Sequence, residues 1–78
     1  MEKTKFIKEL SKILKVSTKK IIETNDFENL DDYDSLSQLS LVLLYDQMKV
    51  DKKLISKLSN MHTLSSIISV LEKNKIIQ

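Results

Sequence analysis

Apolar side chains recur along the first part of the chain with the period of an amphipathic helix. They fall at positions i, i+1, i+4, i+7 and i+8, and lysine and glutamate fill most of the positions between them. The pattern predicts a helix over about residues 3–15, with an apolar face made of Phe6, Ile7, Leu10, Ile13 and Leu14.

A polar break follows this helix. Residues 16–18 interrupt the pattern, and Ser17 is predicted to cap a short turn that carries Ile21 and Ile22 toward the core. Residues 23–34 then predict a polar, acidic loop. Its few apolar residues indicate that the loop packs across the helices instead of extending freely; they are Phe27, Leu30 and Tyr33.

The central helix is predicted to begin at Asp34 or Ser35 and to run to about Lys49. A surface helix needs one apolar stripe, but this one carries two on nearly opposite sides. One side holds Leu41, Leu44, Tyr45 and Met48, and the other holds Leu36, Leu39 and Leu43. Either the helix is buried all round within the bundle, or its second stripe faces a partner.

Two more elements complete the chain. Residues 51–60 predict a short third element, and Thr63 is predicted to cap the last helix. Their apolar positions are Leu54, Ile55 and Leu58 in the first, and Leu64, Ile67, Ile68 and Leu71 in the second. Together the segments predict an all-α fold, a small three- to four-helix bundle that forms a single domain over residues 1–78.

The composition narrows the fold and its setting. The chain has no Gly and no Pro, so we expect Asn, Asp and Ser to form its left-handed helix ends and turns. It has no Cys, which excludes a disulfide framework and a thiolate metal site. No apolar run approaches membrane-spanning length and no targeting segment is visible, so we expect a cytoplasmic protein without a membrane partner. All 13 basic residues are Lys, a bias that suggests an AT-rich bacterial genome.

Charge is distributed unevenly along the chain. Residues 1–25 carry a net charge of +4, residues 26–51 one of −6 and residues 52–78 one of +4, within an overall +2. The acidic segment contains Ser35 and suits basic partners. The lysines of the first helix lack any accompanying Arg and have few aromatic neighbours. They are interpreted as a solvated face, and no nucleic-acid partner is expected.

Little in the sequence suggests catalysis. His62 is the only imidazole and has no companion ligand or nucleophile at a useful spacing, so it is assigned a loop or capping role and no metal site. Ser35 has no nearby base in the sequence that would activate it. The chain is therefore predicted not to be an enzyme. A serine at a helix start is usually an ordinary cap or first helical residue, yet a serine modified by another enzyme is the best candidate for function here.

The tripeptide Asp34-Ser35-Leu36, at a predicted helix start after an acidic loop, resembles the modification motif of the acyl carrier protein family. Leu39, the apolar run to Tyr45, the upstream amphipathic helix and the terminal Thr63-Leu64 helix extend the resemblance over nearly the whole chain. The resemblance implies a four-helix carrier in which Ser35 holds a 4′-phosphopantetheine arm. The thiol of that arm would carry acyl or aminoacyl groups as thioesters.

The same resemblance implies partners. They are a phosphopantetheinyl transferase, toward which Asp34 faces, and acyl-loading and acyl-processing enzymes. The partner-facing surface would also include Leu36, Leu39, Leu43 and Asp46. A carrier that visits several enzymes is expected to be a monomer.

Two departures from the family pattern favour a stand-alone carrier of a specialised biosynthetic pathway over one of fatty-acid synthesis. Asp32 and Tyr33 replace the small residues that are usual before Asp34, and the acids of the central helix are reduced to Asp46. Two alternatives stay open. An all-α protein- or DNA-binding module would use the Lys-rich outer helices, with DNA affinity that weakens steeply with salt. A degenerate carrier would keep the fold and never be modified.

Overall fold

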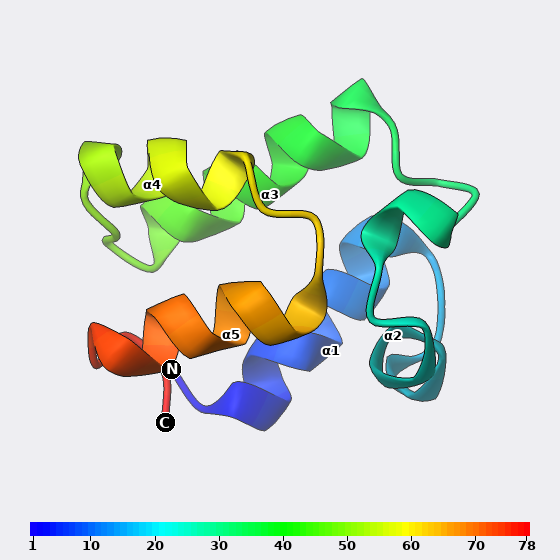
Figure 1. The fold of residues 1–78 in the computed structure, drawn as a ribbon, viewed down its shortest axis with the longest axis horizontal. Helices are drawn as coiled ribbons and strands as arrows, with labels where there is room; N and C mark the ends of the chain where they lie inside the picture. Colours follow the sequence, from blue (N-terminus) through cyan, green and yellow to red (C-terminus); the bar gives the residue numbers. More distant parts are fainter.

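The computed structural model describes residues 1–78 as five α-helices and one turn of 3₁₀-helix (Figure 1). The helices are α1 (Lys3–Leu14), α2 (Thr18–Thr24), α3 (Ser35–Gln47), α4 (Lys52–Ser59) and α5 (Leu64–Lys73), and the 3₁₀ turn is η1 (Phe27–Asn29). The predicted small all-α bundle is confirmed, with more helices than the three or four expected.

The helices pack around one core. α3 packs against α1 and α4, and α1 also packs against α2. The Lys3 N–H donates to the Gln78 carbonyl oxygen at 2.9 Å, and Lys3 Nζ lies 3.5 Å from Glu72 Oε2. These contacts join the start of α1 to α5 and to the end of the chain. The two termini therefore lie side by side (Figure 1). The core has 16 buried apolar residues, among which the most deeply buried include Phe6, Leu10, Ile21, Phe27, Leu58, Ile67 and Leu71.

The segment after α1 differs from its prediction. Ser17 does act as a cap, because its hydroxyl accepts a hydrogen bond from the Lys20 N–H at 3.1 Å, but the segment is the seven-residue helix α2 and not a turn. Ile21 is buried and Ile22 is exposed, so the expectation that both enter the core is wrong for Ile22. Adjacent side chains on a helix differ by about 100° in direction, and a short surface helix buries only one of them.

The acidic stretch before α3 is held against the segment that leads into α5. The Phe27 N–H donates to the His62 carbonyl oxygen at 2.7 Å, and the Leu64 N–H donates to the Asn25 carbonyl oxygen at 2.8 Å. The Asn25 side chain adds a third contact by accepting from the Ser65 N–H at 2.9 Å. The apolar residues of the stretch are buried or half-buried, which confirms that it packs across the helices.

Three helices end at a lysine in the left-handed conformation. These residues are Lys15, Lys49 and Lys75, with φ of 57°, 62° and 58°. The next residue in each case donates its N–H to the carbonyl five positions earlier, the long bond of a Schellman motif; the donors are Val16, Val50 and Ile76. The expectation that Asn, Asp or Ser would take such positions is wrong for these three; Asn25 after α2 also has a positive φ of 60°, but its ψ of −48° lies outside the left-handed helical region. Lysine suits a helix C-terminus because its charge complements the helix dipole, and its aliphatic neighbour packs inward.

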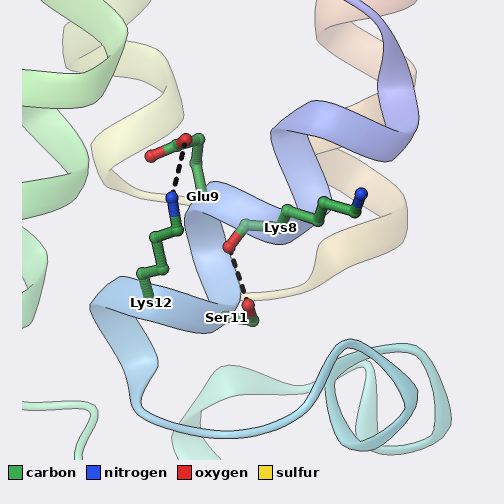
Figure 2. A network of polar contacts seen from close by, with 4 residues as sticks. All are labelled: Lys8, Glu9, Ser11 and Lys12. Carbon is green, nitrogen blue, oxygen red and sulfur yellow. Dashed lines mark hydrogen bonds and ion pairs between the residues drawn. The ribbon is translucent and has the colours of Figure 1, made fainter.

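The outer face of the middle of α1 carries local contacts. Figure 2 shows Lys12 beside Glu9, with Nζ 3.5 Å from Oε1, and the Ser11 hydroxyl donating to the Lys8 carbonyl oxygen at 2.7 Å. Lys8 and Lys12 are exposed, so their charges face water.

Candidate functional site

The start of α3 is fixed by reciprocal hydrogen bonds between Asp34 and Ser37. Asp34 Oδ1 accepts from the Ser37 N–H, and Ser37 Oγ accepts from the Asp34 N–H, each at 2.9 Å. The Ser37 hydroxyl also donates to the Asp34 carbonyl oxygen at 2.9 Å. This arrangement is a capping box in which a serine replaces the usual Glu or Gln at the third helical position. Asp34 is the N-cap, so the first residue of the helix is Ser35, one of the two predicted starting residues.

Hydrogen bonding holds the pKa of the Asp34 carboxyl below its ordinary value. The main cause is the Ser37 N–H, which stabilises the carboxylate, and the Ser37 hydroxyl adds to the effect although some desolvation opposes it. Asp34 therefore keeps its charge and its capping role at neutral pH, while remaining exposed at the surface beside Ser35.

Ser35 is the first residue of α3 and takes no part in the cap. Its side chain is exposed. Because Asp34 and Ser37 make the capping bonds, Ser35 is not the cap, but it does occupy the first helical position, the other ordinary role considered for it. Its hydroxyl faces solvent at the positive end of a 13-residue helix, where an attached anion is favoured.

One apolar face of α3 is buried and the other is exposed. Leu41, Leu44 and Tyr45 are buried in the core. On the other face the side chains are largely in contact with solvent, with exposed fractions of 70% for Leu36, 56% for Leu39 and 55% for Leu43. The alternative in which the helix is buried all round is therefore wrong. Asp46 is also exposed and lies one turn after Leu43 on the same side of the helix.

A mainly apolar cleft of about 160 Å³ opens between α3 and the end of α4. Its lining consists of Tyr33, Gln38, Leu39, Leu41, Val42, Tyr45, Leu58, Ser59 and Met61. Gln38 and Leu39 are exposed and mark its mouth, whereas Tyr45 and Leu58 are each only 1% exposed and form its inner wall.

Ser35 lies on the side of α3 that faces this cleft. Ser35, Leu39 and Val42 are spaced i, i+4 and i+7 and so share one helix face. Leu39 and Val42 line the cleft. A group attached to Ser35 therefore starts one helical turn from the mouth of the cleft.

The two tyrosines of the cleft differ in the state of their hydroxyl groups. The Tyr33 hydroxyl is hydrogen-bonded to His62 Nδ1, and the two rings meet edge to face with centroids 5.7 Å apart. The Tyr45 hydroxyl is buried and has no hydrogen-bond partner. Burial is the main cause that raises the pKa of each phenol above its usual value, and the effect is much larger for Tyr45.

A second, more polar groove of about 260 Å³ lies between the end of α1 and the start of α3. Lys12 and Lys15 line it together with Asp32 and Asp34. The segment around Ser35 is acidic in sequence, as predicted, but the fold adds two lysines from α1 beside it. The local charge on this side of Ser35 is therefore more balanced than the segment alone indicates.

Sequence reasoning did not find three features of the site. It placed His62 in a loop, which is correct, but not in contact with Tyr33, 29 positions away. It assigned Tyr45 to the core without indicating that its hydroxyl lacks a partner. It interpreted Lys12 and Lys15 as solvated and did not bring them to Asp34. Each feature depends on contacts between distant segments, for which one sequence offers no signal.

None of the helices has both the length and the apolar character needed to cross a membrane. The structure also contains no cluster of three His, Cys, Asp or Glu side chains with the arrangement of a metal site. Comparisons with protein-family models, with curated proteins and with solved structures returned no match.

Proposed function

We propose that this chain is a carrier protein and not an enzyme. Ser35 would hold 4′-phosphopantetheine, whose thiol carries an acyl or aminoacyl group as a thioester. The observation that carries the proposal is the state of Ser35, which is exposed, first in α3 and relieved of capping by Asp34 and Ser37. A phosphodiester at this position gains roughly 0.3–1 kcal/mol from the helix N-terminus.

The surroundings of Ser35 support carriage in two ways. The cleft offers an apolar environment that begins one helical turn from Ser35, the residue that would hold the arm. The exposed apolar face of α3 offers a contact surface for other proteins, since leucines grouped on a small domain often mark interaction sites. In this proposal the docking surface consists of Asp34, Leu36, Leu39, Leu43 and Asp46.

The partners would be a phosphopantetheinyl transferase and the enzymes that load and process the carried group. The transferase supplies the base that takes the proton from the Ser35 hydroxyl, and Asp34 beside it offers a negative charge for docking. We further propose that the protein is a monomer in the bacterial cytoplasm. We also propose that it serves a specialised biosynthetic pathway, because the α3 surface carries a single acid, Asp46, among its leucines.

The test is the intact mass of the protein after incubation with coenzyme A, Mg²⁺ and a broad-specificity phosphopantetheinyl transferase. We expect one added phosphopantetheine on the wild type and none on Ser35→Ala. Ser40→Ala is the matched control, because it removes another hydroxyl from α3 and should still be modified.

Circular dichroism must show that each protein is folded. A folded wild type that gains no mass would overturn the proposal in favour of a degenerate carrier or a helical binding module. A mass gain that persists in Ser35→Ala would show that the carrier site lies elsewhere.

A further inference from the structure

Ser37 is the exception among the buried residues of this protein. Of the 17 buried residues, 16 belong to the apolar core, and the other is Ser37, with an exposed fraction of 6%. Its Oγ accepts from the Asp34 N–H and donates to the Asp34 carbonyl oxygen, each at 2.9 Å. A buried hydroxyl needs such bonds, because folding has removed it from water. The burial of Ser37 is therefore favourable while Asp34 is the cap of α3.

The sequence contains a second, competing start for α3. Ser35 followed by Gln38 three positions later has the usual form of a capping box, in which the serine oxygen accepts from the Gln38 N–H and the glutamine side chain reaches back to the Ser35 N–H. Asp and Ser are about equally good caps, so cap preference alone does not exclude this start. In the structure the Gln38 side chain is exposed, and its N–H donates to the Asp34 carbonyl oxygen at 3.0 Å.

The two starts differ in the state of the Ser35 hydroxyl. With Asp34 as the cap, Ser35 is the first helical residue and its side chain is exposed. With Ser35 as the cap, its Oγ would be held against the backbone by the Gln38 N–H. Modification needs this oxygen free. The oxygen forms a bond to the phosphorus that carries the pantetheine arm, the pyrophosphate bond of coenzyme A breaks, adenosine 3′,5′-bisphosphate leaves, and the hydroxyl proton passes to the base of the transferase.

We infer that Ser37 is a positioning residue for the modification of Ser35, because its buried hydroxyl holds α3 to the start at which Asp34 is the cap and the Ser35 hydroxyl is free. The start at Ser35 would break both bonds of the Ser37 hydroxyl and leave it buried without a partner. The choice of helix start depends only on these contacts. Its consequence for modification rests on the proposed carriage at Ser35.

The first measurement is the backbone conformation of Ser35, read from its carbon chemical shifts by nuclear magnetic resonance. We expect helical values in the wild type and a movement toward extended values in Ser37→Ala, because losing a capping bond changes the equilibrium between the two starts by roughly 5-fold. Ser37→Thr keeps a hydroxyl and should stay helical. Ser40→Ala is the matched control, since the hydroxyl that it removes from α3 donates to the Leu36 carbonyl oxygen and takes no part in the cap.

The second measurement is the rate of modification by the transferase with coenzyme A as the concentration of the protein is varied. A transferase that binds only protein with a free Ser35 responds to the fraction in that state, so Ser37→Ala should raise KM roughly 2–5-fold and leave kcat unchanged. Ser37→Thr and Ser40→Ala should match the wild type. Adding Gln38→Ala to Ser37→Ala removes the side chain that completes the competing box and should bring KM back toward the wild-type value.

The outcomes separate this inference from the proposed function, with circular dichroism verifying that each variant is folded. If the wild type is modified and Ser37→Ala keeps its chemical shifts and KM, carriage stands and the role of Ser37 is overturned. A raised KM that Gln38→Ala does not lower would also overturn it, because the loss would then not come from the competing start. If no mass is added to the folded wild type, the proposed function fails, and the chemical shifts of Ser35 alone decide whether Ser37 sets the helix start.

Discussion

Replacing Tyr45 with Phe should stabilise the unmodified protein, which is the reverse of the usual effect of deleting a buried hydroxyl. The hydroxyl is buried without a partner, and an unsatisfied polar group costs about 1–3 kcal/mol. Tyr45→Phe removes this cost and leaves the ring, which packs in the core, in place. Allowing for the small space left by the missing oxygen, we expect a gain of about 1 kcal/mol at pH 7.

The difference between the two proteins should grow at alkaline pH. Burial raises the pKa of the Tyr45 phenol far above its value in the unfolded chain, which is about 10. Well below pH 10 the phenol is neutral in both states, so its ionisation does not affect stability. Above pH 10 the unfolded state ionises first, which favours unfolding of the wild type. At pH 11 the wild type should lose about 1.4 kcal/mol that Tyr45→Phe keeps.

The measurement is urea unfolding followed by circular dichroism at pH 7 and pH 11. All other residues are the same in both proteins, so the comparison isolates Tyr45. Tyr33→Phe is the matched control: it removes a hydroxyl that is bonded to His62 and should cost about 0.5–1.5 kcal/mol at pH 7. The reasoning is refuted if Tyr45→Phe is also less stable at pH 7, or if its advantage does not increase at pH 11.

Three further substitutions test the two faces of α3 and its end. Leu43→Gln should change the free energy of unfolding by less than about 0.5 kcal/mol, whereas Leu44→Ala should lower it by about 2–5 kcal/mol, because only Leu44 is buried. Both are measured by urea unfolding, and equal losses would contradict the outward-facing position of Leu43. Lys49→Gly should raise the melting temperature, because the left-handed conformation costs a non-glycine residue about 1–2 kcal/mol. The greater conformational freedom of glycine in the unfolded chain offsets only part of that gain. A lower melting temperature would mean that contacts of the lysine side chain stabilise the fold by more than the backbone conformation costs.

Most of the helices could be predicted because their signals are local. Thr63 caps α5 as expected, with its hydroxyl accepting from the Ser66 N–H, and the apolar periods of α1 and α5 match their buried faces. The end of α3 was placed two residues too late, at Lys49, because nothing in the local pattern showed that this residue turns left-handed. A lysine followed by an aliphatic residue is too common to indicate a helix end by itself.

The candidate site was predictable in its position but not in its chemistry. Ser35 was identified from the Asp34-Ser35-Leu36 tripeptide at a helix start, yet the sequence left open whether Asp34 or Ser35 begins the helix. Only the three-dimensional bonds show that Ser37 completes the cap with Asp34 and that Ser35 does not. The outward direction of Leu36, Leu39 and Leu43 was also undecided, because it depends on how far the other helices cover α3.

The placement of both tyrosines in the cleft gives the protein a built-in optical probe. The chain has two Tyr and no Trp, and Tyr33 and Tyr45 both line the cleft. Tyrosine emission and near-ultraviolet dichroism therefore come from this part of the molecule, without competing signal from an indole. Events in the cleft can therefore be followed in the unlabelled protein, and a pH titration of its absorbance separates the two phenols, because burial raises the pKa of Tyr45 much more than that of Tyr33.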